Sequence, residues 1–136
     1  MATLTEQART AQWLKWMTNR GYCLAERTIE ADAVGGAAAA LYTGDVLRLG
    51  TGVKLIAVSA TTGADAVAVL LEDVTAAENA ADVTRLVLVR GPAVIDSDNL
   101  VFTESDTQKA AAITALAALD IRVTEAGSAT WTTQTT

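Results

Sequence analysis

The sequence predicts a β-rich α+β domain, a small β-barrel or sandwich of short strands with a helical segment near each end. The first observation is a series of Val- and Leu-rich runs between residues 45 and 91, separated by Gly, Thr or acidic turn segments. This spacing is typical of barrels and sandwiches and not of alternating β–α units. The second observation is helical spacing in residues 3–20 and 105–120. A chain of 136 residues suffices for one domain with its own core.

The composition limits both the core and the partners. Hydrophobic residues make up 51% of the chain but aromatic residues only 4%, so the core consists mainly of Ala, Val and Leu. Such small side chains bury little area each, and oligomerisation would bury more. The net charge of −6 argues against nucleic acid as a partner, because nucleic acid requires a basic surface. No apolar stretch approaches the ~18 residues that span a bilayer, so no membrane partner is expected.

The residue inventory excludes the common catalytic sites. The chain has no histidine and one cysteine, Cys23, which removes Ser-His-Asp triads, Cys-His pairs and HExxH zinc sites. Residues 50–54 lack the ending of a phosphate loop, residues 96–99 lack the glycine and distal glutamate of a calcium loop, and both are predicted turns. Glu72 and Asp73 are expected to face water. We therefore expect no enzymatic activity, no catalytic residue, no cofactor and no metal site.

The N-terminal segment, residues 3–20, is predicted to be a helix. Thr3 and Glu6 have the spacing of a capping box, and Gly21 fits a C-terminal cap. Four further residues share one face of this helix: Trp13, Trp16, Met17 and Arg20. Two interpretations of the tryptophan face stay open. It packs on the domain's own core, or it binds another molecule as an interface hot spot.

The remaining elements follow in order. Residues 22–33 are predicted to form a strand that runs into a turn, and the Gly- and Ala-rich residues 34–44 a loop. A helix over residues 105–120 begins with Ser105 and Gln108 at capping-box spacing. The predicted strands of the central and C-terminal parts are residues 45–50, 53–60, 66–74, 83–91 and 121–125.

One strand-like stretch is interrupted by the tripeptide Arg90-Gly91-Pro92, which contains the only proline of the chain. A central strand tolerates proline poorly, because the ring removes a backbone donor and fixes φ. The sequence therefore predicts that the chain bends, bulges or leaves a sheet edge at this point.

The order of these segments resembles the head decoration proteins of tailed bacteriophages, the lambda head decoration protein family. The resemblance covers roughly residues 22–123, and "VLVRGPAVI" is its most specific piece. The matching positions are Gly44, Val46 and Leu47, followed by residues 69–76, 87–94, 100–102 and 106–123. The predicted N-terminal helix departs from the family, whose members approach the capsid with an extended arm.

The resemblance implies a β-tulip-like fold and a capsid decoration, or cement, protein. Such a protein binds the outside of the expanded head as a homotrimer at three-fold and quasi-three-fold positions, with the major capsid protein as its partner, and stabilises the shell. It is made in the cytoplasm of the bacterial host and resides on the virion. The alternative is a non-viral small β-barrel that serves as an oligomeric binding or assembly module.

The chain is accordingly divided into an N-terminal helical arm (residues 1–21), a decoration-protein β domain (22–123) and a flexible Thr-rich tail (124–136). The residues predicted to contact the capsid or a neighbouring protomer are Leu4, Trp13, Trp16, Met17, Arg20, Arg90 and Pro92.

Overall fold

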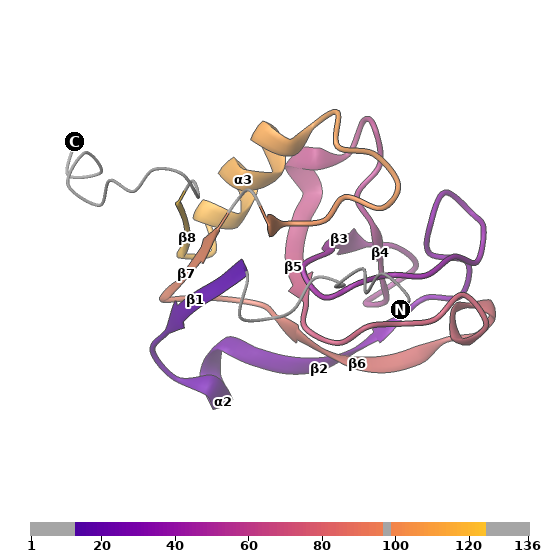
Figure 1. Cartoon of the computed structure of the whole chain (residues 1–136), viewed down its shortest axis with the longest axis horizontal. Coiled ribbons are helices and arrows are strands. Elements are labelled where there is room, and N and C mark those ends of the chain that lie inside the picture. Colours follow the sequence, from indigo (N-terminus) through magenta and orange to yellow (C-terminus); the bar gives the residue numbers. More distant parts are fainter. Residues whose placement is uncertain (1–12, 97–98, 125–136) are drawn as a thin grey trace, which may run out of the picture.

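Two β-sheets and one helix form the part of the chain that the computed structural model describes, residues 13–96 and 99–124. Figure 1 shows a three-stranded sheet on the left, a ring of five strands to its right and helix α3 above them. The β-rich α+β prediction is confirmed. The elements are β1 (Leu14–Met17), α2 (Arg20–Cys23), β2 (Leu24–Ile29), β3 (Val46–Leu49), β4 (Leu55–Ala57), η1 (Gly63–Asp65), β5 (Ala66–Leu70), η2 (Glu78–Ala80), β6 (Val83–Leu88), β7 (Ala93–Asp96), α3 (Lys109–Ala117) and β8 (Ile121–Thr124).

The five-stranded ring has the order β2-β4-β3-β5-β6, and β6 returns to β2 in six antiparallel pairs from Leu24↔Leu88 to Ile29↔Val83. Parts of the ring are buried on both faces, whereas Glu26 and Arg27 on β2 and Thr84 on β6 are exposed. Leu47 belongs to one apolar cluster together with Leu70 and Val87, whereas the adjacent Val46 belongs to a second cluster. Because successive strand residues point to opposite faces, burial on both faces explains the near-continuous Val and Leu runs of the sequence.

The second sheet has the order β1-β7-β8, with β7 antiparallel to β1 and parallel to β8. Helix α3 packs against it through Ala112 and Leu116, which lie in one cluster with Ile95 and Ile121. The predicted C-terminal helix followed by a strand is confirmed. The helix is shorter than predicted, and Ser105 and Gln108 do not form a capping box: Gln108 Oε1 instead accepts from Gly63 N, at 2.7 Å.

The break at residues 90–92 carries the chain from the ring to the second sheet. Strand β6 ends at Leu88 and β7 begins at Ala93, so the predicted bend is confirmed. The edge alternative is wrong, because β6 lies between β2 and β5 and β7 lies between β1 and β8. Gly91 N donates to Leu119 O at 2.9 Å, and a Cβ at Gly91 would lie 1.7 Å from Asp120 O. Only glycine fits this close approach of two backbones.

The predicted N-terminal helix is wrong beyond Trp13, which is itself helical. Residues 14–17 form β1, Gly21 lies inside the short helix α2 instead of ending a longer one, and Asn19 Oδ1 caps α2 by accepting from Tyr22 N. Tertiary pairing with the central strand β7 outweighs the local helical pattern, because β7 needs a hydrogen-bonding partner on each side. Thr3, Glu6 and the tail residues 125–136 lie outside the described residues.

Polar side chains fix the long connections of the ring. The predicted loop 34–44 is confirmed as irregular. The buried side chain of Asn79 holds this loop and the residues just before it through hydrogen bonds to their backbone. Its Oδ1 accepts from Ala33 N at 3.0 Å and Ala39 N at 3.3 Å, and its Nδ2 donates to Glu30 O at 3.0 Å. One side chain thereby satisfies three backbone groups that have no strand partner.

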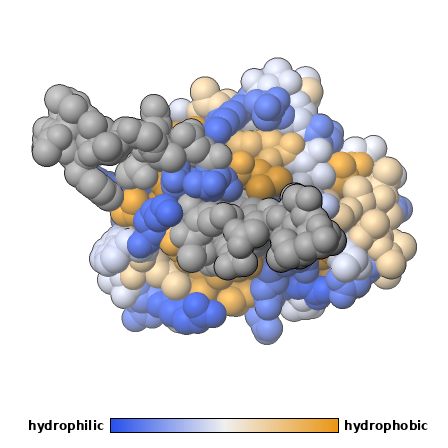
Figure 2. Space-filling model, viewed as in Figure 1, coloured by the Kyte–Doolittle hydropathy of each residue, from blue (hydrophilic) through white to orange (hydrophobic). Residues whose placement is uncertain are grey.

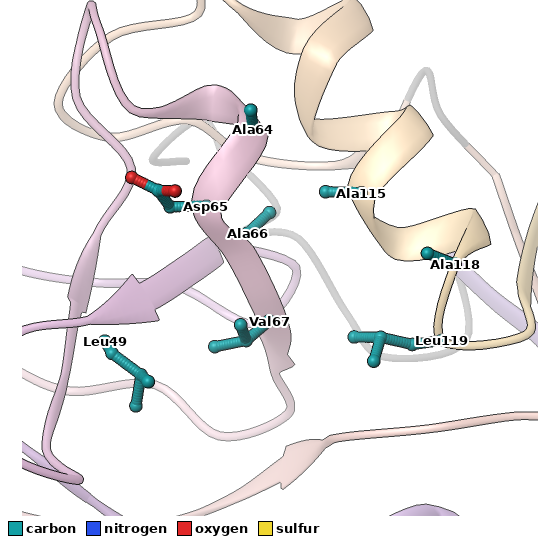
Figure 3. Close-up of a pocket in the computed structure, with 8 residues that line it drawn as sticks. All are labelled: Leu49, Ala64, Asp65, Ala66, Val67, Ala115, Ala118 and Leu119. Carbon is teal, nitrogen blue, oxygen red and sulfur yellow. The ribbon is translucent and has the colours of Figure 1, made fainter.

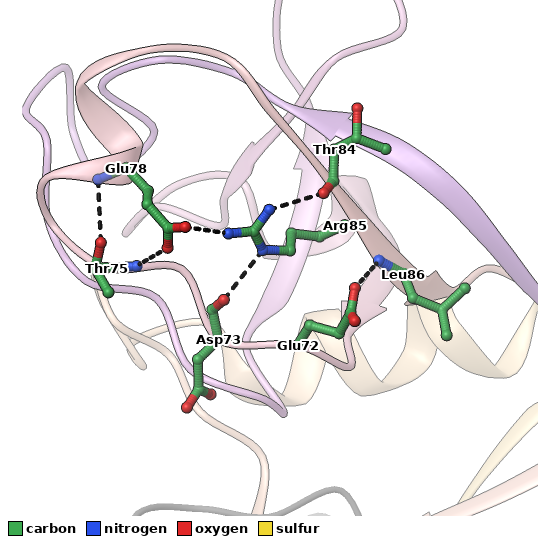
Figure 4. A network of polar contacts seen from close by, with 7 residues as sticks. All are labelled: Glu72, Asp73, Thr75, Glu78, Thr84, Arg85 and Leu86. Atoms are coloured by element: carbon green, nitrogen blue, oxygen red, sulfur yellow. Dashed lines mark hydrogen bonds and ion pairs between the residues drawn. The ribbon is translucent and has the colours of Figure 1, made fainter.

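The connection between β5 and β6 contains a second network, shown in Figure 4. Thr75 and Glu78 exchange hydrogen bonds as a capping box: Thr75 N donates to Glu78 Oε1 at 2.9 Å, and Glu78 N to Thr75 Oγ1 at 3.1 Å. Arg85 pairs with Glu78 at 2.7 Å. Glu72, expected only to face water, also accepts from Leu86 N at 2.8 Å, so it anchors the next strand.

Candidate functional site

The outer face of the three-stranded sheet presents a row of side chains across its strands. Trp16 on β1 pairs with Val94 on β7, which pairs with Arg122 on β8. Directly opposed residues point to the same face of a sheet. Trp16 is 53% exposed, Val94 is half-buried and Arg122 is exposed, so this row faces solvent. The neighbouring row, Met17 with Ala93 and Ile121, faces the core.

A β-bulge decides which way Trp16 points. Leu14 pairs with Ile95, whereas Trp16, two residues later, pairs with Val94, only one residue away. The extra residue, Lys15, reverses the alternation of side chains, so Leu14 turns toward the core and Trp16 toward solvent. Without the bulge, both residues would share one face.

Trp13 belongs to the core and not to the contact surface. It is fully buried, and its Nε1 donates to Thr43 Oγ1 at 2.9 Å. A Cβ at Gly44, where φ is 99°, would lie 3.0 Å from Trp13 Cδ1. The prediction that Trp13 and Trp16 share one binding face is therefore wrong: the bulged strand places the two tryptophans in different environments.

Four other predicted contact residues meet near Trp16, where β1, α2 and the break come together. Thr18 N donates to Pro92 O at 3.0 Å, which ties the end of β1 to the exposed Pro92. Arg90 Nη1 donates to Tyr22 O at 2.7 Å, and its guanidinium lies 4.9 Å from the centre of the Tyr22 ring. Arg20 is exposed on α2, and Met17 is half-buried against the core. Leu4 lies outside the described residues.

Sequence reasoning missed three residues of this surface: Tyr22, Val94 and Arg122. Tyr22 is 57% exposed and stacks under Arg90, but it lies 68 residues away in the chain. In the sequence, Val94 and Arg122 cannot be distinguished from other strand residues. No local signal identifies them, because only the pairing of β1 with β7 and of β7 with β8 brings them beside Trp16.

A second exposed apolar surface is a groove between α3 and β5, with a volume of about 430 Å³. Figure 3 shows Leu119 pointing toward β5, while the Asp65 carboxylate points away from α3. An adjoining hollow of about 280 Å³ shares Leu49, Val67 and Leu119 with the groove. In Figure 2, apolar surface reaches solvent in the region of α3 and β5. We call the groove and the hollow together the α3–β5 groove.

Asp45 is the one carboxyl group in the described residues whose pKa is raised. Burial raises it most, and the nearby Asp73 charge adds to this, against hydrogen bonds that favour the charged form. Its oxygens accept from Thr103 Oγ1 at 2.6 Å, Thr103 N at 3.0 Å and Tyr42 N at 2.9 Å. These contacts join the turn before β3 to the segment after residue 99, which is a structural role.

The described residues hold no group of three or more His, Cys, Asp or Glu side chains placed to bind a metal ion. Their helices are all too short or too polar to cross a membrane. The outer row of the three-stranded sheet combines an aromatic, an apolar and a basic side chain: Trp16, Val94 and Arg122.

Comparison with known proteins identifies the class. The family model described as bacteriophage lambda head decoration protein D matches residues 3–121. No curated protein matches the chain. Because the family match covers most of the sequence, from β1 through α3, the chain belongs to the bacteriophage lambda head decoration protein D family, the structural, non-enzymatic proteins of the virion capsid surface.

Proposed function

We propose that this protein is a cement protein that binds the outside of the expanded head as a trimer, at three-fold and quasi-three-fold positions, and bridges neighbouring subunits of the major capsid protein. The observation that carries the proposal is the outward-facing Trp16 on an edge strand within a chain of the decoration family. Family membership favours this function over a non-viral assembly module.

The extended conformation of β1 supports the proposal. A helix over residues 3–20 would have set this chain apart from relatives that approach the capsid with an extended arm. Instead, residues 14–17 are a strand at the edge of a sheet. The N-terminal departure from the family is therefore absent over these residues.

The surface around Trp16 has the composition of a protein-binding site. Arg90 stacks on Tyr22, which belongs to the helix that follows β1, and Arg20 and Pro92 are exposed. Aromatic residues and arginine dominate the energetics of protein interfaces. We propose that Trp16, Arg20, Arg90 and Pro92 contact either the shell or a neighbouring protomer.

The stabilising mechanism would be mass action. A ligand that binds only the expanded lattice stabilises it by RT ln(1 + [L]/Kd), about 4 kcal/mol per site at a thousandfold excess over Kd. Three protomers acting together would raise the effective affinity further, because the second and third contacts become intramolecular.

The test is co-sedimentation of the protein with expanded heads and with unexpanded precursor shells, followed by thermal disruption of the heads. We expect binding to expanded heads only and a higher disruption temperature when they are decorated. Replacing Arg20 and Arg90 by Glu should weaken binding while the unfolding curve of the free protein stays close to native. Equal binding to both shells, or no change in disruption temperature, would contradict the proposal.

A further inference from the structure

The two parts of the molecule differ in the sign of their charge. Residues 24–88, which span the ring, contain four basic and nine acidic residues. The three-stranded sheet with α2 and the break, residues 14–23, 89–96 and 118–124, contains four basic and two acidic residues, and one of these two, Asp96, is buried. A chain of net charge −6 therefore carries a local basic region at one sheet. We call four residues of this region the basic surface: Trp16, Arg20, Arg90 and Arg122.

The three arginines of the basic surface form no ion pair with a carboxylate of the described residues. Asp120 is exposed two residues before Arg122, yet the two side chains make no ion pair. Arg90 donates to the Tyr22 carbonyl and stacks on the Tyr22 ring, and neither contact neutralises its charge. A guanidinium without a carboxylate partner can still form the paired hydrogen bonds that arginine makes to carboxylates. The basic surface therefore fits an acidic partner.

The exposed indole in the basic surface favours a protein as this partner. Trp16 is 53% exposed and shares its outward row with Val94 and Arg122. Tryptophan and arginine are the residue types that most often dominate protein interfaces. A nucleic acid would be repelled by the net charge of −6, whereas an acidic patch on a protein meets the basic surface alone.

The acidic ring of a second copy is a poor partner, because most of its carboxylates are engaged within their own protomer. Asp82 lies 2.7 Å from Lys54, and Glu78 lies 2.7 Å from Arg85. Four further carboxylates of the ring accept hydrogen bonds from backbone N–H groups: Glu30, Asp45, Glu72 and Asp73. The carboxylates that complement the basic surface must then come from a different protein.

We propose that the basic surface docks on a carboxylate-rich region of the major capsid protein. This inference rests on the proposed function and specifies the chemistry of the shell surface that the protein recognises. The arginines pair with carboxylates of the shell around a buried Trp16, and the acidic ring faces away from the shell. Because the two parts of the molecule differ in charge, an acidic shell turns the basic surface toward itself during encounter and raises the association rate.

Carbodiimide cross-linking of decorated heads identifies the partner groups directly, because it joins a lysine amine to a carboxyl group in contact with it. Arg122→Lys and Arg20→Lys each keep the charge of the basic surface and supply the amine at an exposed position. Arg27→Lys is the matched control on an exposed residue of the ring. We expect residues 122 and 20, but not residue 27, to be joined to Asp or Glu of the capsid protein, as located by mass spectrometry.

Association kinetics with expanded heads at several salt concentrations give the second measurement. We expect Arg122→Glu and Arg20→Glu each to slow binding about tenfold or more at low salt, and to make the remaining binding less dependent on salt. Arg27→Glu makes the same change of charge on the ring and should bind like the native protein. Urea melts check that the three variants are folded.

The outcomes separate this inference from the proposed function. Head binding that is independent of salt and unchanged by both reversals overturns the acidic partner and leaves the cement function standing. Decorated heads that give no cross-link through residue 122 or residue 20 do the same. A cross-link from either residue to Asp or Glu of a second copy overturns the assignment to the shell, because it places the basic surface between protomers. A native protein that binds no heads overturns the proposed function and this inference together.

Discussion

The five-stranded ring and the three-stranded sheet differ in how many of their faces are buried. Strands of the ring contribute to apolar clusters on both faces, so that Val46 and Leu47, adjacent in sequence, lie in different clusters. The three-stranded sheet buries one face against α3 and leaves Trp16, Val94 and Arg122 on the other. We expect the ring to contribute most to stability, and the exposed face of the sheet carries the proposed binding surface.

The two tryptophans provide the largest test of this comparison. Trp13→Ala should lower the free energy of unfolding by about 3–5 kcal/mol, because it removes a fully buried aromatic side chain and leaves Thr43 without its donor. Trp16→Ala should lower it by less than about 1 kcal/mol, since half of that side chain is already in water. Urea melts of the two variants measure both values. Equal losses would show that the outer face of the sheet is as important for folding as the core.

Two asparagines sharpen the comparison. Asn79→Ala leaves the backbone N–H groups of Ala33 and Ala39 without their acceptor. This substitution should lower the free energy of unfolding by about 2–3 kcal/mol. Asn19→Ala beside the sheet removes the exposed cap of a four-residue helix and should cost about 1 kcal/mol. Chemical denaturation gives both values, and amide hydrogen exchange should show loss of protection at Ala33 in the first variant only. A larger loss for Asn19→Ala would reverse the assignment of stability to the ring.

The third test is the pH dependence that Asp45 confers. Burial raises its pKa above the ordinary value of 3.8, so the folded protein holds this proton more tightly than the unfolded chain. The resulting stability is fully present below that ordinary value and is lost as the pH rises through the raised pKa. The difference in free energy of unfolding between the native protein and the Asp45→Asn variant should therefore shift in favour of the native protein as the pH falls toward 3.8. Urea melts across this range measure it, and a parallel pH dependence of the two proteins would contradict the prediction.

The smallest effect is expected from the exposed network of the β5–β6 connection. Hydrogen bonds from Thr75 and the contact with Arg85 lower the pKa of Glu78. The stability that the charged Glu78 contributes is therefore present above the ordinary pKa and is lost as the pH falls through the lowered pKa. The sign is opposite to that of Asp45. Because Glu78 is exposed, Glu78→Gln should change stability slightly, and less so at high salt. A large or salt-independent loss in urea melts would show that the connection is part of the core.

The strands of the ring and the break at residue 90 could be predicted, because alternating apolar runs, glycine turns and one proline are local signals. The N-terminal helix could not be rejected from sequence. The bulge in β1 places Leu14 and Met17 on the inner face, three residues apart, and a helix gives the same spacing. Only β7, some eighty residues later in the chain, decides between the two.

The candidate site was predictable in part for the same reason. Trp16, Arg20, Arg90 and Pro92 were found because tryptophan, arginine and proline are conspicuous residue types in a chain poor in aromatics. Tyr22 and Arg122 lie on the same surface through pairings across the fold. Glycine is required at position 91 because the backbone carbonyl of Asp120 lies where a Cβ would be, and no local sequence pattern around residue 91 predicts this contact.

The antiparallel pairing of β1 with β7 determines how the protein would bear mechanical load. A force applied at Trp13 along the axis of β1 would load the hydrogen bonds between the two strands together in shear, and would not peel them apart one after another. At the start of β1, the buried indole of Trp13 next to Thr43 and Gly44 opposes sliding of β1 along β7. At its end, the hydrogen bond from Thr18 N to Pro92 O does the same. All four residues of β1 would share such a load.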